Sequence, residues 1–310
     1  MVPTLAEATA VRAIDSHTYA VDFDPEWCVG SVPHGGMVTS AILSATTTHF
    51  RTTLAAQNQP HTISLHVDFL RRTQGGPATL TIREVKLGRQ TSIVHVALSQ
   101  NGRDEVVAHA THSNMDVESG LSLHTGWSLH PPPPPLPADF ATLATTGASG
   151  DANWVEETSR PFAESRKVCN RVRTFLPRGG QVMPGIVDEW LRLESGDKFT
   201  NESLGLASDM FPSVITDLWG CGLNGKEGDA PPFWHPTVLL NLDIKRLLPP
   251  GGAEWLFVRV RPKCLRNGRM DLEVVILDQA GEVLALSHHV VLVVSPERNL
   301  AARRVGQNKI

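Results

Sequence analysis

A run of prolines near the middle of the chain restricts its possible folds more than any other feature. Five prolines occupy positions 131–135, and Pro137 follows after a single leucine. Proline fixes φ and has no backbone N–H, so this run can enter neither a helix nor a paired strand, and an extended polyproline segment is expected. The 310-residue chain is also long for one domain. We therefore predict an N-terminal domain at 1–119, a proline-rich linker at 120–160 and a C-terminal domain at 161–310. The prolines could alternatively be a ligand for a proline-binding domain.

Composition and charge exclude several classes of partner. The 28 basic and 32 acidic side chains give a net charge of −4, so neither nucleic acid nor an anionic membrane is attracted overall. No apolar stretch reaches the roughly 18 residues needed to cross a bilayer, and the N-terminus does not resemble a secretory signal. The four cysteines (Cys28, Cys169, Cys221 and Cys264) are scattered, without metal-ligand spacing. We predict a cytoplasmic protein with reduced thiols and no bound metal.

Two short patterns recur about 175 residues apart. His66-Val67-Asp68-Phe69-Leu70-Arg71 is repeated in kind by Asn241-Leu242-Asp243-Ile244-Lys245-Arg246. A second pair, 106–112 and 283–289, follows a turn signal in each half. The same order at nearly the same offset favours an internal duplication.

Each half is predicted to contain one helix followed by four strands. The first helix runs from Met37 to about Phe50, where apolar residues recur at helical spacing. The second begins after Thr200 or Asn201, is kinked at Pro212 and continues to Leu218. The expected strands are 62–70, 78–87, 92–100 and 105–113 in the first half, and 236–246, 255–265, 270–278 and 282–294 in the second. Helices segregated from antiparallel strands indicate an α+β fold.

Two motifs in this order resemble a known family. Pro33-His34-Gly35-Gly36-Met37 stands at the start of the first helix, and a segment from His66 to Arg72 follows that helix. The chain resembles the double-hotdog acyl-CoA thioesterase II group and its fungal thioesterase-like relatives. The resemblance implies two antiparallel sheets, each wrapped round a central helix and packed as a pseudo-dimer, in a monomer or a homodimer. It also implies hydrolysis of an acyl-CoA or an acyl-carrier thioester.

The same resemblance implies three catalytic positions that hold a water. The family's helix aspartate matches Asp209, which ends the segment Leu204-Gly205-Leu206-Ala207-Ser208-Asp209. Its strand threonine or serine falls on Asn241, and its glutamine falls on His289, within one residue. Two of the three positions therefore depart in residue type from the family pattern.

Residue chemistry leaves alternatives open at each candidate. Asp209 could be a general base in an apolar cleft or an exposed helix carboxylate. Asn241 and His289 could hold a water or face outward on their strands. Gly35 and Gly36 would let a substrate approach the helix start, where backbone N–H groups can polarise a carbonyl, or would simply allow a tight turn. His34 beside them is a candidate acid, base or helix cap.

Coenzyme A carries phosphates, which implies basic side chains at the mouth of the pocket. The candidates, all near strand ends, are Arg71, Arg72, Arg89, Lys245 and Arg246. The sequence has no dinucleotide-binding glycine motif, no Walker loop and no serine-hydrolase elbow, so no cofactor is predicted.

Two other functions fit the same pattern. A hotdog hydratase or dehydratase could use His34 or His66 with Asp68 or Asp209. A protein that binds an acyl or polyketide ligand without hydrolysing it would account for the altered catalytic positions.

Overall fold

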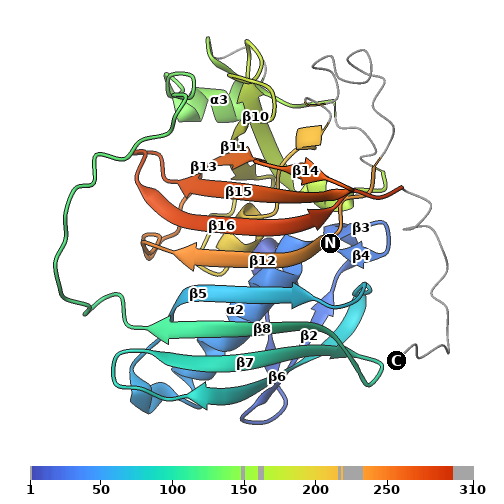
Figure 1. The fold of residues 1–310 in the computed structure, drawn as a ribbon, viewed down its shortest axis with the longest axis vertical. Coiled ribbons are helices and arrows are strands. Elements are labelled where there is room, and N and C mark those ends of the chain that lie inside the picture. The colour runs from blue at the N-terminus through green and yellow to red at the C-terminus, as the bar shows by residue number, and fades with distance from the viewer. Residues whose placement is uncertain (1, 148–150, 160–163, 216–217, 219–232, 296–310) are drawn as a thin grey trace.

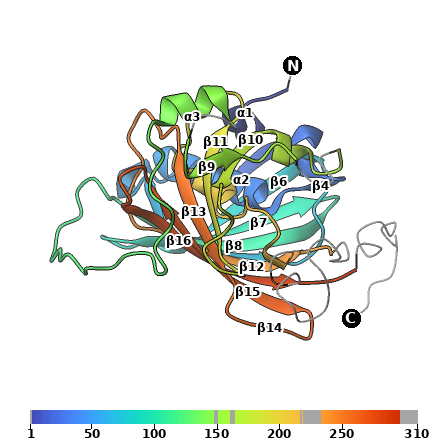
Figure 2. The same cartoon turned by 90° about the horizontal axis from the view of Figure 1, so that it is seen from above.

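A long helix that begins at a pair of glycines lies at the centre of the molecule. The computed structural model describes residues 2–147, 151–159, 164–215, 218 and 233–295. Helix α2 runs from Gly35 to Arg51, as predicted, and the His34 side chain caps its N-terminus. Most of its side chains are buried, including several small polar ones, because α2 lies on the inner side of a curved sheet (Figure 2).

The eight predicted strands are confirmed. They are β5 (His61–Phe69), β6 (Gly76–Lys86), β7 (Ser92–Gln100), β8 (Arg103–Ser113), β12 (Thr237–Ile244), β13 (Leu256–Arg261), β15 (Arg269–Leu277) and β16 (Val283–Leu292). Further short strands extend the sheet: β1 (Arg12–Ala13), β2 (Thr18–Phe23), β9 (Trp154–Glu156), β10 (Val172–Pro177), β11 (Val187–Leu193) and β14 (Leu265–Arg266). Strands β3 (Cys28–Val29) and β4 (Val32–Pro33) form a separate hairpin.

Both halves share one antiparallel sheet. Its order in the described residues is β1-β2-β6-β7-β8-β5-β12-β16-β15-β13-β11-β10-β9, with β14 beside β15. The halves meet where β5 pairs with β12, in the middle of Figure 1, and His66 lies opposite Asn241. The two repeated segments are therefore direct neighbours, as an internal duplication with approximate two-fold symmetry requires. The structure confirms the predicted α+β fold.

The second predicted helix is much shorter than expected. Helix α4 covers only Leu204–Ala207, and its cap is Ser203 rather than Thr200 or Asn201. The chain leaves the helix before Pro212 and returns to helical geometry at Val214 and Ile215. The part of the prediction that extends over 216–217 lies outside the described residues.

Regular structure also occurs inside the range predicted as a linker. The proline run has neither helix nor strand, as expected, but α3 (Phe140–Thr146) and β9 follow it within 120–160. Their Leu143 and Trp154 join a buried aromatic cluster with Trp190 and Trp255. The apolar area of this cluster explains why the segment packs on the C-terminal half instead of crossing solvent.

Four short helical segments and the thiols complete the description. Helix α1 covers Leu5–Ala8, and 3-10 turns occur at Pro25–Trp27, Ala55–Gln57 and Lys167–Asn170. Cys28, Cys169 and Cys264 form no disulfide with one another, and Cys221 lies outside the described residues. None of the helices in the described ranges has the length and apolar character to span a bilayer.

Candidate active site

Asp209 lies where the two helices cross. It follows α4 by two residues, and its Oδ2 accepts a hydrogen bond of 2.8 Å from the backbone N–H of Gly36, in the first turn of α2. A second bond ties the same helices together, since Leu206 N donates to Ser40 Oγ over 2.9 Å. The Asp209 side chain is only 11% exposed. Asp209 is therefore a largely buried carboxylate, fixed by a hydrogen bond, and not an exposed one.

Gly35 and Gly36 are each required for a different close contact. A Cβ on Gly35 would lie 2.7 Å from Asp209 Oδ2, so only glycine lets the carboxylate approach. A Cβ on Gly36 would lie 2.8 Å from both Gly205 O and the Leu206 Cα, so glycine there lets α4 cross α2 in backbone contact. The Gly36 N–H, a predicted donor to substrate, is instead shared between Asp209 Oδ2 and His34 Nδ1 in this structure.

His289 faces Asp209 from strand β16. Its side chain is fully buried, and Nδ1 lies 3.6 Å from Asp209 Oδ1 without a hydrogen-bond partner among the described residues. Ser287 Oγ donates to the carbonyl of Asn241 over 2.6 Å, so it can accept from His289 Nε2, 3.0 Å away. Burial lowers the pKa of His289 to about 4, which leaves the ring neutral with a lone pair on Nδ1. Two acceptor atoms, Nδ1 and Oδ1, thus point at one another.

His34 completes the group as a neutral ring. Its Nδ1 accepts from Gly36 N and lies 3.5 Å from Asp209 Oδ2. Burial lowers the pKa of His34, although the nearby Asp209 charge opposes this shift. A neutral ring whose Nδ1 accepts a hydrogen bond carries its proton on Nε2.

A mostly apolar cavity of about 550 Å³ opens beside this group. His34, Gly35 and Asp209 line it, together with apolar side chains such as Phe69, Phe211 and Leu272. Of the five predicted basic residues, Arg71 and Arg72 line the cavity, and Arg166 joins them. Arg89, Lys245 and Arg246 do not line it. Lys245 lies 3.6 Å from Asp243, and Arg246 lies 3.6 Å from Asp278.

The prediction that Asn241 shares this site is wrong. Leu240 lies opposite His289 in the sheet and faces inward with it, so strand alternation turns Asn241 to the outer face. There its Oδ1 forms a 2.7 Å hydrogen bond with His66 Nδ1, and His66 Nε2 lies 3.2 Å from Asp68. The possible lyase pairs that include His66 or Asp68 therefore lie on the opposite side of the sheet from Asp209.

Sequence reasoning missed Thr237. This residue begins β12, four positions before Asn241, and lines the same cavity as Asp209. It is the only hydroxyl residue of the strand Thr-Val-Leu-Leu-Asn-Leu-Asp-Ile. Residue type was the available signal, because the resemblance called for a threonine or serine on this strand.

Comparison with known proteins identifies the family. The acyl-CoA thioesterase N-terminal domain matches residues 23–115, and the acyl-CoA thioesterase C-terminal domain matches residues 137–293. The chain belongs to the acyl-CoA thioesterase family. It is thus a hydrolase of that family with the double hotdog arrangement of an N-terminal and a C-terminal thioesterase domain.

Individual relatives agree with this family assignment. The thioesterase-like protein TwmA of Talaromyces wortmannii is 34% identical, over 98% of this chain and 95% of that protein. A hot dog fold protein from Alicyclobacillus acidocaldarius superposes with a TM-score of 0.73 at 18% identity, over 96% of this chain and 100% of that one. The acyl-CoA thioesterase II TesB2 of Mycobacterium marinum gives a TM-score of 0.63 at 17% identity, over 95% and 100%. These two structures support the fold.

Proposed function

We propose that this chain hydrolyses an acyl thioester with a water held between Asp209 and His289. The observation that carries the proposal is the pair of facing acceptors, Asp209 Oδ1 and His289 Nδ1, 3.6 Å apart beside the cavity. A water that donates one hydrogen to each acceptor would satisfy both groups. Its oxygen lone pairs would then be directed away from the protein groups and toward a bound acyl group.

Asp209 is assigned the general base. As the water attacks the thioester carbon, one of its protons passes to the Asp209 carboxylate, and the thiolate of the carrier leaves. The bond from Gly36 N holds the other carboxylate oxygen, so Oδ1 keeps its position during the transfer. His289 accepts the second hydrogen of the water and orients it.

The carbonyl oxygen needs a donor as negative charge develops on it. We assign this role to the Nε2–H of His34, because Gly36 N–H is already used and His34 lines the cavity. Thr237 is assigned a second polar contact to the thioester or the water. The apolar walls would hold the acyl chain and exclude bulk water.

Arginines at the cavity match a phosphorylated carrier. Arg71, Arg72 and Arg166 would contact phosphate groups of coenzyme A or of an acyl carrier. Arg71 is fixed by a 2.7 Å bond from its Nη1 to the carbonyl of Asp104. The acyl chain itself would enter from this side and reach Asp209.

Replacing the base tests the assignment. Asp209→Asn keeps the shape of the side chain and removes the proton acceptor, so kcat should fall by about 10²–10⁴-fold while KM changes little. The measurement is thiol release over a panel of acyl-CoAs, with the acyl products analysed alongside. Asp243→Asn is the matched control, because Asp243 pairs with Ser64 and Lys245 on the outer face.

The same assay separates the other functions. An unchanged kcat for Asp209→Asn would contradict its role as base. A modified acyl chain without thiol release would indicate a lyase. Saturable acyl-CoA binding with no turnover in the wild type would indicate a binding protein.

A further inference from the structure

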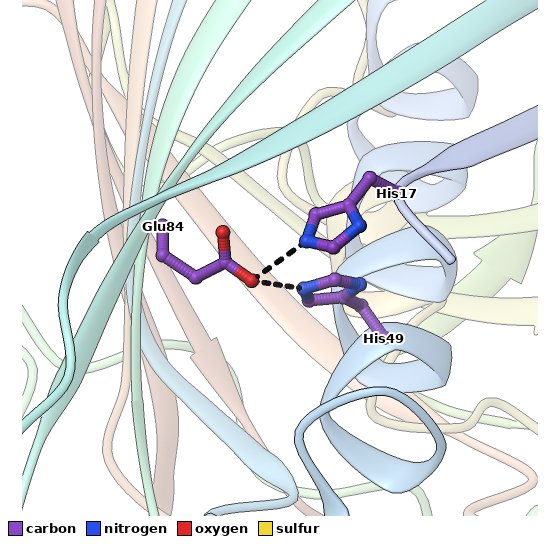
Figure 3. A group of neighbouring side chains, drawn as sticks. All are labelled: His17, His49 and Glu84. Atoms are coloured by element: carbon purple, nitrogen blue, oxygen red, sulfur yellow. Dashed lines mark hydrogen bonds and ion pairs between the residues drawn. The ribbon is translucent and has the colours of Figure 1, made fainter. Parts of the chain in front are cut away.

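Three residues far apart in the sequence converge at the other end of α2. His17 lies in the turn between β1 and β2, His49 in the last turns of α2, and Glu84 in β6 (Figure 3). Glu84 Oε1 is 2.9 Å from His17 Nε2 and 3.5 Å from His49 Nε2. All three atoms lie within 4.8 Å of one another.

The His49 imidazole is the unusual member of this group. Its side chain is fully buried, and Nε2 has no hydrogen-bond partner among the described residues. Its Nδ1 lies 3.0 Å from the Tyr19 hydroxyl, which itself donates to the carbonyl of Ser16. In the tautomer that donates from Nδ1 to the Tyr19 hydroxyl, the Nε2 lone pair faces the Glu84 carboxylate. Such an arrangement of two acceptors is stabilised when a cation lies between them.

The three atoms are close enough to bind one transition-metal ion after small side-chain adjustments. In a tetrahedral zinc site with bonds of about 2.0–2.2 Å, ligand atoms are about 3.3–3.6 Å apart. The Glu84–His49 distance of 3.5 Å already lies in this range, and the 2.9 Å from Glu84 to His17 would lengthen. Two imidazoles and one carboxylate are a common three-ligand set for Zn²⁺. The contact from His49 Nδ1 to Tyr19 is the outer-shell partner that ligating histidines usually have.

We propose that His17, His49 and Glu84 bind one divalent transition-metal ion, with Zn²⁺ the best match to the donor set. His17 and Glu84 are 40% and 27% exposed, so solvent reaches the site and can supply a fourth ligand. The ion ties the β1–β2 turn and β6 to the end of α2. His49 lies thirteen positions after Gly36 along α2, about 20 Å at 1.5 Å per residue, so the metal acts on stability and not on the acyl site.

Zinc titration of the metal-free full chain tests the proposal. Calorimetry should show one saturable Zn²⁺ site per chain, and Co²⁺ should give visible d–d bands without a thiolate charge-transfer band. His17→Gln and Glu84→Gln should each weaken binding by more than the roughly 10–100-fold expected when an outer-shell partner is lost. Tyr19→Phe, which removes only that partner, should weaken binding by about 10–100-fold. Zn²⁺ should raise the Tm of the wild type by mass action.

His66→Gln is the matched control. His66 is also 40% exposed and lies 3.2 Å from a carboxylate, Asp68, on the outer face of the sheet. This variant should bind Zn²⁺ like the wild type. The proposal is overturned if the wild type shows no saturable binding, if thiolate bands appear, or if His17→Gln and Glu84→Gln bind as tightly as His66→Gln.

Discussion

At the scale of single residues, burial decides the protonation state of the candidate active site. His289 is completely buried, and this lowers its pKa to about 4. A protonated His289 would carry an N–H on Nδ1, which faces Asp209 Oδ1 from 3.6 Å, and could no longer accept a hydrogen bond there. The proposed water therefore requires the neutral ring.

Substitution of His289 tests this role. His289→Leu removes the acceptor, and a lost hydrogen bond worth about 1–3 kcal/mol corresponds to about 5–150-fold in kcat. His289→Gln should recover much of the rate, because the amide oxygen can accept the same hydrogen. Asn241→Ala on the outer face should leave kcat unchanged. A His289→Leu enzyme as active as the wild type, with an unchanged melting curve, would contradict the assigned role.

At the scale of elements, the crossing of α2 and α4 positions Asp209. The backbones touch because Gly36 and Gly205 lack a Cβ, and a Cβ on Gly205 would lie 2.6 Å from Ser40 N. The short α4 is sufficient for this purpose, since Asp209 follows it by only two residues.

Gly36→Ala should therefore separate the two helices. Overpacking at a backbone contact costs about 1–3 kcal/mol of unfolding free energy, and kcat should fall with it because Asp209 moves with α4. Gly179→Ala is the control, since a Cβ there meets nothing within 4 Å, and its effect should stay within about 0.5 kcal/mol. Urea unfolding gives the free energies. Equal stability of the two variants would show that α4 accommodates the methyl group.

At the scale of the whole molecule, several histidines are buried in the neutral form. Burial lowers the pKa of His112 to about 3, and its ring stacks on Phe50 with centroids 4.0 Å apart. His112 also contacts Thr62 Oγ1 and the carbonyl of Gln59. Burial shifts the pKa of His49 and His235 in the same direction.

These shifts predict a loss of stability in mild acid. In the unfolded chain, His112 and His289 take up protons near pH 6.5, whereas in the folded chain they do so only near pH 3–4. The free energy of unfolding is therefore highest above pH 6.5 and falls as the pH decreases through this window. Each such histidine contributes about 1.4 kcal/mol per pH unit within it. Urea unfolding at pH 7, 6 and 5 measures the slope. His112→Gln should flatten it by about that amount. A free energy that does not change between pH 7 and 5 would contradict the prediction.

Local sequence patterns determined much of the architecture. Runs of β-branched residues located the eight long strands, of which β7, and β12 from Leu240 on, bury every second residue. Helical spacing located α2, although most of its surface is buried. Strand β11 was missed because all but one of its residues are buried, including Asp188, which pairs with Arg259 over 2.6 Å. Because both faces of β11 are buried, its sequence does not alternate between apolar and polar residues.

Only the tertiary structure decided which side chains meet. Gly36 belongs to α2 and His289 to β16, and Asp209 follows α4 by two residues. Packing brings Asp209 within 2.8 Å of Gly36 N and 3.6 Å of His289 Nδ1. The same holds for His17, His49 and Glu84, which no spacing in the sequence connects. Asn241 lies outside the site because adjacent residues of a strand face opposite sides of the sheet, and its neighbour Leu240 is the residue opposite His289. The pattern of apolar and polar residues in one segment shows which of its faces is buried. A functional site forms where several segments, distant in the sequence, pack against one another.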